Sequence, residues 1–170
     1  MLQDYRQEEV RSLVEGLNYA QKVQRSLDLI AEAWQEYGDR LVVANSLGKD
    51  SVVVWHLVKR VSPQIRGFIV TTRFKPRETV EFMHQQVAQY PELRVFRNDE
   101  PIPDGLWRTD PDRCCEQLKV EPTRRAIEEM NVGCWVTGLR CTEGRTRTDF
   151  QEVEERDAGL VTVSYTHLRA

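Results

Sequence analysis

Apolar residues recur at steps of three and four along the first part of the chain, which is the spacing of a helix that buries one face. This spacing predicts a helix over about residues 5–37, and Gly38 stands where a glycine commonly ends a helix. The predicted apolar face consists of Leu13, Leu17, Ala20, Val23, Leu27, Ile30 and Trp34. We therefore expect residues 1–38 to form an N-terminal helical segment.

Short apolar runs then alternate with longer segments of helical spacing. The predicted strands cover residues 41–44, 67–72, 93–96 and 132–137, and the predicted helices cover residues 51–61, 77–90 and 122–130. Between them, residues 98–117 are polar, contain three prolines and show no clear period.

This alternation predicts an α/β fold, with a mostly parallel sheet and helices on both of its faces. In such sheets ligands bind beyond the carboxyl ends of the strands. The loops at Asn45, Thr72 and Gly138 should therefore converge on one crevice. We expect this α/β domain to span residues 39–163.

Composition adds limits on the function. The 170 residues are 40% hydrophobic and 30% charged, as in one globular domain. The net charge of −3 argues against a generally basic, nucleic-acid-binding surface, so an anion site must be local. No apolar run approaches the ~20 residues of a membrane span, and the first residues lack the apolar core of a signal peptide. We therefore predict a cytoplasmic protein with no membrane or nucleic-acid partner.

A candidate phosphate-binding loop lies between the first predicted strand and the helix that follows it. Gly48 permits a tight turn, and the start of the next helix offers unpaired N–H groups to an anion. Lys49 adds positive charge, and Ser46 and Ser51 add hydroxyl donors. The glycines of a Walker loop stand farther apart. The alternative is a simple turn in which Asp50 or Ser51 caps the helix.

The run from Ser46 to Ser51 resembles the PP-loop of the adenine-nucleotide alpha-hydrolase-like superfamily, whose usual form is Ser-Gly-Gly-Lys-Asp-Ser. Leu47 replaces one glycine of that form. The resemblance implies a Rossmann-like fold that binds ATP or an adenylylated sulfate, with Ser46, Gly48, Lys49, Asp50 and Ser51 at the nucleotide. Its members include ATP pyrophosphatases, tRNA-thiolation enzymes, the ATP sulfurylase small subunit, and adenylylsulfate (APS) or phosphoadenylylsulfate (PAPS) reductases.

Two further segments resemble the APS/PAPS reductases. Residues 114–122 are similar to their Cys-Cys and Lys-Val-Glu-Pro run, and residues 135–140 are similar to Trp-Ile-Thr-Gly-Leu-Arg. The resemblance implies a sulfate-assimilation oxidoreductase that reduces adenylylated sulfate to sulfite with a thioredoxin-type reductant. It adds to the binding residues Lys119, Gly138, Arg140, Arg145 and Arg147. Guanidinium groups hold phosphate or sulfate in a bidentate manner, although a solvated basic turn is the alternative for these arginines. A homo-oligomer is among the assemblies expected.

The chain has four cysteines, and a reducing compartment favours metal binding or redox chemistry over disulfides. Iron–sulfur clusters are usually held by four thiolates. The resemblance makes Cys114 and Cys115 two ligands of a [4Fe–4S] cluster, with Lys119 nearby, and gives this chain only these two. Cys134 lies in an apolar run and is expected to be a buried hydrophobe, and Cys141 matches no ligand position.

Other segments point to different members of the superfamily. In residues 71–79, Lys75 and Arg77 match the ATP sulfurylase small subunit, whereas Thr79 matches the reductases. The alternatives are therefore an ATP-using PP-loop enzyme, such as that subunit or a thiolation enzyme, and a non-catalytic nucleotide-binding remnant.

The reductase pattern continues to a second cysteine pair and a Glu-Cys-Gly-Leu-His tail, whose cysteine is the nucleophile. Nothing in this chain matches either element. We therefore expect a C-terminally truncated reductase in which residues 164–170 are a tail of doubtful origin, and we assign no catalytic residue.

Overall fold

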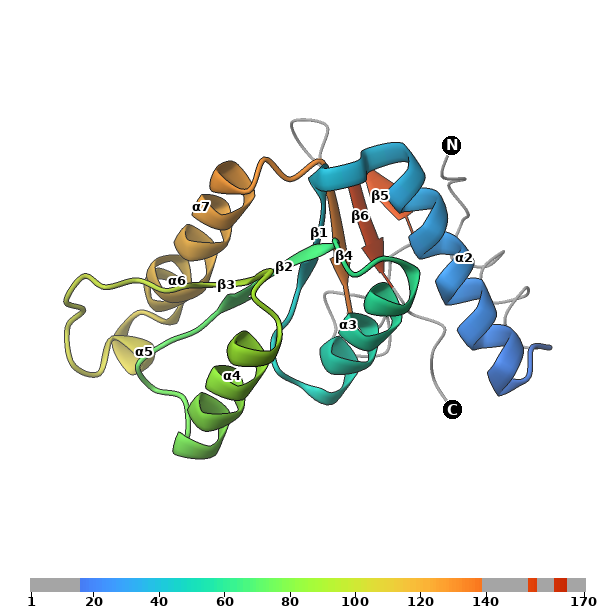
Figure 1. The fold of residues 1–170 in the computed structure, drawn as a ribbon. Coiled ribbons are helices and arrows are strands. Elements are labelled where there is room, and N and C mark those ends of the chain that lie inside the picture. Colours follow the sequence, from blue (N-terminus) through green and yellow to red (C-terminus); the bar gives the residue numbers. More distant parts are fainter. Residues whose placement is uncertain (1–15, 139–152, 156–160, 165–170) are drawn as a thin grey trace.

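A computed structural model describes residues 16–138, 153–155 and 161–164 of the chain. They form one six-stranded sheet in the order β3-β2-β1-β4-β6-β5 (Figure 1). The strands are β1 (Leu41–Ala44), β2 (Arg66–Val70), β3 (Leu93–Phe96), β4 (Cys134–Thr137), β5 (Val153–Glu155) and β6 (Val161–Ser164). All neighbouring strands pair in parallel except β5, which runs antiparallel to β6. The prediction of a mostly parallel sheet is confirmed.

Helices cover both faces of this sheet, as predicted. The longer ones are α2 (Tyr19–Tyr37), α3 (Lys49–Val61), α4 (Arg77–Gln89) and α7 (Glu121–Glu129). On one face, α2, α3 and α4 share a core that includes Ile30, Trp55 and Met83. On the other face, α7 packs Ala126 against Phe68 of β2. Because α2 contributes to the same core as α3, it is packed as part of the α/β layer (Figure 1).

Helix α2 begins later than its apolar spacing predicted. Asn18 ends the preceding chain with a capping box: its Oδ1 accepts from the Gln21 N–H at 3.0 Å, and its own N–H donates to Gln21 Oε1 at 2.8 Å. Residues 16–18 are therefore not helical, and the earlier part of the predicted helix lies outside the described residues. The other end is confirmed, because Gly38 is the C-cap with a φ of 51° and opens the short 3₁₀ turn η1 (Gly38–Arg40).

The polar stretch 98–117, whose sequence shows no clear period, contains helices. It holds α5 (Leu106–Thr109), α6 (Pro111–Cys115) and the start of η2 (Glu116–Val120), a π turn that leads into α7. Helix α6 begins on local chemistry, with Pro111 in its first turn and Asp110 Oδ1 accepting from the Arg113 N–H at 3.0 Å. Leu106 is the one buried residue of α5, and α6 has none, so no apolar period marks these helices.

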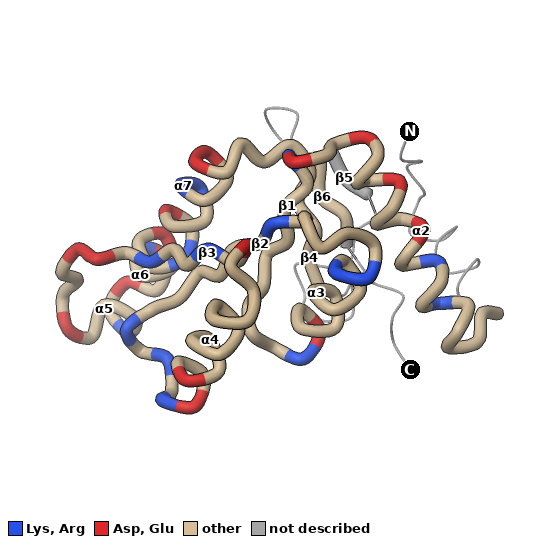
Figure 2. The backbone as a smooth tube through the Cα atoms, viewed as in Figure 1, with Lys and Arg blue, Asp and Glu red and all other residues tan. Residues whose placement is uncertain are grey.

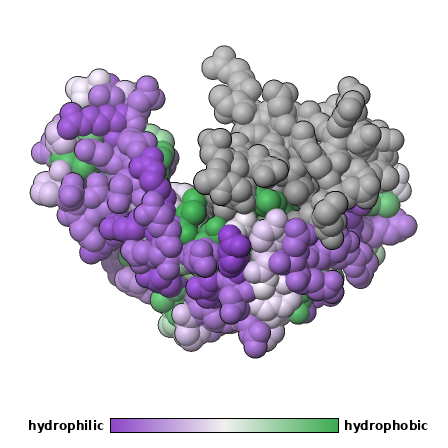
Figure 3. Space-filling view, turned by 90° about the horizontal axis from the view of Figure 1, so that it is seen from above, coloured by the Kyte–Doolittle hydropathy of each residue, from purple (hydrophilic) through white to green (hydrophobic). Residues whose placement is uncertain are grey.

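Charged residues of both signs are interspersed along the helices and loops of the described part (Figure 2). Seen from above, most of the visible described surface is hydrophilic, and apolar residues show at a hollow in its middle (Figure 3). No described helix combines the length and apolar character that a membrane crossing requires.

Candidate functional site

The carboxyl ends of β1, β2 and β4 open into a cleft of about 520 Å³. Asn45, Thr72 and Gly138 all line it, so the predicted convergence of their loops is confirmed. The cleft has a polar side, formed by the loop between β1 and α3, and an apolar side that includes Phe68, Val70 and Trp135. Such a mixture suits a ligand with both charged and aromatic parts.

The loop between β1 and α3 is held in shape by its own side chains. Asn45 is 1% exposed, and its Oδ1 accepts from the Leu47 N–H at 2.8 Å. The Ser51 hydroxyl lies 3.2 Å from the same oxygen, 2.9 Å from the Gly48 carbonyl and 3.1 Å from the Ser46 hydroxyl. The Asn45 Nδ2 is buried without a partner. This ordering role of Asn45 was missed from the sequence, where it appeared only as the residue that follows a strand.

Helix α3 starts directly after this loop, with Gly48 as its N-cap and no side chain capping its first turn. The first N–H groups of a helix have no partner within the helix, so an uncapped start favours an anion. The alternative of a cap by Asp50 or Ser51 is wrong, because both residues lie inside the helix. The Lys49 side chain is exposed at the first helical position and is not among the residues that line the cleft.

Leu47 has a φ of 65°, in the left-handed region that favours glycine. A non-glycine residue there costs roughly 1–2 kcal/mol of backbone energy. The half-buried side chain packs against the core shared by α2, α3 and α4, which offsets part of this cost. The loop thus keeps a glycine-like backbone although one glycine of the resembled motif is replaced.

Gly138 brings the end of β4 against the start of α3. A Cβ atom at this position would stand 3.0 Å from the Ser51 nitrogen and 3.1 Å from the Asp50 carbonyl carbon. A side chain here would force the start of α3 to shift by a few tenths of an ångström, so glycine favours this close approach. The predicted Arg140, Arg145 and Arg147 lie outside the described residues, as does Cys141.

The opposite wall of the cleft comes from two other segments. Lys119 of η2 and Thr123 of α7 line it, and the Thr123 hydroxyl donates to the Lys119 carbonyl at 2.7 Å. Lys75, in the loop after β2, lines it as well. Thr123, Lys75 and Trp135 were not predicted as site residues. The available signal for Lys75 was its position just beyond a strand end.

The predicted cluster ligands lie at the end of α6, where Cys114 is half-buried and Cys115 is exposed. Within the described part, neither is among the residues that line the cleft. Cys134 is buried in β4, and its burial, with the charge of Glu36 adding to the effect, raises the pKa of its thiol to about 12. No three His, Cys, Asp or Glu side chains gather as a metal site among the described residues.

A family model described as the phosphoadenosine phosphosulfate reductase domain matches residues 40–163. An adenosine 5'-phosphosulfate reductase of Halalkalibacterium halodurans is 31% identical over 84% of this chain and 64% of its own length. The same enzyme of Geobacillus thermodenitrificans is 31% identical over 78% of this chain and 59% of its own length. The chain thus spans about 60% of the length of these relatives.

Solved structures share the fold at lower identity. A phosphoadenylyl-sulfate reductase from Candida auris, in a phosphate complex, superposes with a TM-score of 0.70 at 18% identity, over 98% of this chain and 82% of that one. An FMN adenylyltransferase from Candida glabrata, bound to FMN and an ATP analogue, has a TM-score of 0.62 at 11% identity, over 92% of this chain and 57% of that one.

Proposed function

The chain belongs to the phosphoadenosine phosphosulfate reductase domain family, and on that premise we propose that its cleft binds an adenylylated sulfate for thiol-dependent reduction to sulfite. The observation that carries the proposal is the loop before α3, which is ordered by Asn45 and leads into an uncapped helix start inside the cleft. This arrangement suits a phosphate group.

The two sides of the cleft suggest how such a ligand lies. Its phosphate faces the start of α3, where Lys49 supplies a positive charge next to the helix N-terminus. Lys119 and Lys75 add positive charge on the other walls. The adenine ring fits the apolar side, where the rings of Phe68 and Trp135 stand 5.8 Å apart between centroids. Arg140, Arg145 and Arg147 remain proposed anion ligands outside the described residues.

The proposed reaction transfers the sulfo group of the substrate to a thiol. A thiolate attacks the sulfate sulfur, the bond between that sulfur and the bridging phosphate oxygen breaks, and the nucleotide leaves with both electrons of that bond. The product is a thiosulfonate, which a thioredoxin-type dithiol then reduces to sulfite while becoming a disulfide. The groups in the cleft would stabilise the negative charge that grows on the leaving phosphate. We assign no described residue as the thiolate.

The described residues meet the requirements of a [4Fe–4S] cluster only in part. Cys114 and Cys115 are accessible thiols outside the packed core, which suits iron ligands, and we propose them as two of the four. Cys134 does not fit, because its burial keeps the thiol protonated. Since the described residues supply two ligands, no step of the proposed reaction is derived from a cluster.

A second candidate function is use of ATP, as in the ATP sulfurylase small subunit or a thiolation enzyme. The observation that favours it is Lys75, which lines the cleft from the loop where the sequence matches the sulfurylase form. A longer polyphosphate would use this extra cation. A non-catalytic nucleotide-binding remnant is the third candidate.

Calorimetric titration with APS, PAPS, ATP and adenosine separates these candidates. We expect APS or PAPS to bind at least ten-fold more tightly than ATP, and adenosine to bind weakly. Sulfite release is then measured with thioredoxin, thioredoxin reductase and NADPH. Tight binding of ATP alone would contradict the reductase proposal in favour of the ATP-using alternative. Similar affinity for APS, PAPS, ATP and adenosine would favour the remnant. A lack of sulfite release would not by itself do so, because no described residue is assigned as the thiolate.

A further inference from the structure

The helical run from α6 to α7 contains one turn that is wider than an α-helix. In η2 the Glu121 N–H donates to the Glu116 carbonyl, five residues back instead of four. Pro122 follows immediately and is buried. A proline inside a regular α-helix offers no N–H, and its ring clashes with the carbonyl four residues earlier. The wider turn accommodates Pro122 without breaking the run.

The extra residue also changes which positions share a face. An α-helix advances about 100° per residue, so residues eight apart differ by about 80° around the axis. Across η2, however, Arg124 Nη2 reaches Glu116 Oε1 at 3.1 Å, although the two residues are eight apart. In the regular α7, the ion pair between Arg125 and Glu121 joins residues four apart, with 4.0 Å between Arg125 Nε and Glu121 Oε1. The wide turn therefore brings positions on its two sides back toward one face.

Lys119 belongs to this turn. Its side chain and that of Thr123 line the cleft, while Leu118 and Pro122, each one position earlier, are buried. The buried pair fixes the rotation of the turn about its axis, and the hydrogen bond from Thr123 to the Lys119 carbonyl fastens the same face. The direction of the Lys119 ammonium thus depends on where the inserted residue stands.

We propose that the π turn η2 is a positioning element, whose extra residue sets Lys119 on the wall of the ligand cleft. The proposal rests on the proposed function, in which Lys119 contacts the anionic part of an adenylylated sulfate. Pro122 favours the turn, and the ion pair between Glu116 and Arg124 spans it.

The test removes the extra residue. Deleting Val120, which is 38% exposed, together with Pro122→Ala allows a regular α-helix through this region. We expect this variant and Lys119→Ala each to bind APS at least ten-fold more weakly by calorimetry. Adding Lys119→Ala to the deletion variant should cause no further loss, because Lys119 has already left the cleft wall. Pro122→Ala alone keeps the chain length, and its affinity should stay within about two-fold of wild type.

Circular dichroism and thermal melting establish that each variant is folded. If the deletion variant fails to fold, Lys119→Ala combined with Val120→Lys moves the ammonium by one position on an unchanged backbone. This variant should stay as weak as Lys119→Ala, and recovery of wild-type affinity would overturn the proposal. Wild-type affinity in a folded deletion variant, or an undiminished effect of Lys119→Ala within it, would overturn it too. An absence of APS binding by the wild-type chain would instead overturn the proposed function, and this proposal with it.

Discussion

At the scale of single residues, the loop between β1 and α3 brings a glycine, two hydroxyl groups and a buried asparagine to the cleft. Gly48 and Ser51 sit in the cleft as expected, because a glycine and a hydroxyl between a strand and a helix leave few other arrangements. The role of Asn45 in ordering the loop was not predicted, because it depends on hydrogen bonds from Leu47 and Ser51 that form only in the folded loop. Which residues of the more distant η2 and β4 face the loop also required the structure.

Lys49→Ala should weaken the binding of APS without affecting that of adenosine. The lysine lies at the start of α3, where its charge adds to that of the helix N-terminus. Losing one charge-assisted phosphate contact costs about 1.5–3 kcal/mol, or roughly 10- to 150-fold in affinity. Calorimetry with both ligands measures this, and Arg60→Ala, at the far end of the same helix, is the control. Equal losses for APS and adenosine would indicate general disruption instead.

At position 47, a glycine variant should be at least as stable as an alanine variant, whereas alanine is usually the more stable of the two. Leu47→Ala keeps the left-handed backbone with a Cβ, whereas Leu47→Gly relieves roughly 1–2 kcal/mol of backbone energy. Against this, a glycine lowers the free energy of unfolding by up to about 1 kcal/mol relative to alanine, because it gives the unfolded chain more conformational freedom. We therefore expect Leu47→Gly to be at least as stable as Leu47→Ala in urea unfolding.

Val52, half-buried in α3, is the matched control for Leu47. There the glycine variant should be less stable than the alanine variant by about 1 kcal/mol, because glycine is a poor helix former. The same preference for alanine at both positions would mean that the left-handed backbone of Leu47 carries no strain.

At the scale of elements, apolar spacing predicts the helices and strands that bury a face. It does not predict the elements that bury little. Strand β1 is predicted to the residue, because both of its faces are covered and its sequence is apolar throughout. Helices α5 and α6 are missed, because an N-cap and a proline start α6 and because Leu106 is the one buried residue of the two helices. β5 and β6 are short strands in a sequence without a clear apolar run, and were also missed.

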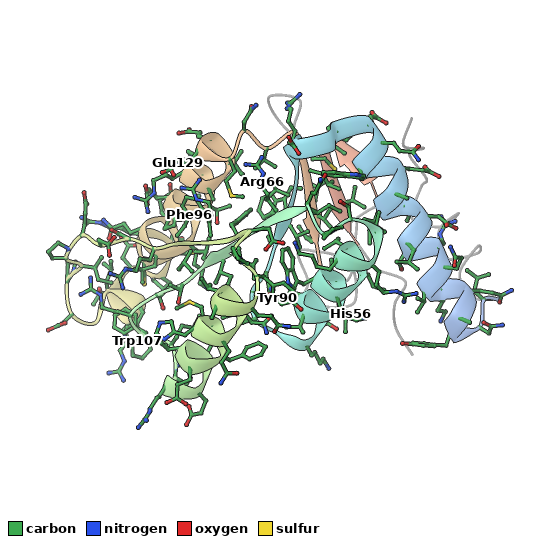
Figure 4. The ribbon with its side chains drawn as sticks, viewed as in Figure 1. His56, Arg66, Tyr90, Phe96, Trp107 and Glu129 are labelled. Atoms are coloured by element: carbon green, nitrogen blue, oxygen red, sulfur yellow. The ribbon has the colours of Figure 1, made fainter. Side chains whose placement is uncertain are left out.

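The junction of α3 with β3 is fastened by a half-buried ion pair. Lys59 Nζ lies 2.7 Å from Glu92 Oε1, donates to the carbonyls of Pro63 and Ile65, and stands 4.4 Å from the Trp55 ring centroid. Tyr90, whose ring meets Trp55 edge-on, lies beside α3 (Figure 4). Burial raises the pKa of the Glu92 carboxyl, but the hydrogen bond from Lys59, a backbone hydrogen bond and the charge of Lys59 outweigh that effect and lower the pKa from its ordinary value.

Glu92→Gln should therefore remove stability that depends on pH. A carboxyl whose folded pKa is lowered stabilises the fold above its unfolded pKa, and this contribution disappears as the pH falls through the folded value. We expect the variant to lose about 1–2 kcal/mol near pH 7 and to approach wild-type stability below about pH 4. Glu81→Gln, which breaks an exposed pair with Arg77, is the control and should cost less than about 0.5 kcal/mol. A Glu92→Gln deficit that stays constant with pH would contradict the pairing.

At the scale of the whole molecule, the order of strands and helices in the chain predicts the layered α/β fold. Parallel strands joined by helices leave one edge where strand ends and loops meet, and the cleft lies there. The boundaries proposed at residues 38 and 163 remain predictions, as do the cytoplasmic location and the oligomeric state. The periodicity of apolar residues reports which face of an element is buried. It does not report where a domain ends, where the protein resides or which other chains it contacts.

The iron content follows from the count of available thiols. Of the four cysteines, Cys134 is buried with its thiol pKa raised to about 12, so at most three can bind iron. After anaerobic reconstitution we expect well below the ~4 iron atoms per chain of a [4Fe–4S] cluster. Cys114→Ser and Cys115→Ser should lower the iron further, while Cys134→Ser should not. Full iron and acid-labile sulfide in the wild-type chain would contradict this account.

The role of the cleft is tested most directly by a crystal structure of the chain grown with AMP. We expect the phosphate within hydrogen-bond distance of the N–H groups at the start of α3, and the adenine ring on the side of Phe68 and Trp135. A second hollow, of about 670 Å³, lies along the edge strand β3 between α4 and α7 and is lined by Arg94, Phe96 and Glu129 (Figure 4). AMP bound in that hollow, or a cleft without nucleotide at saturating AMP, would contradict the account.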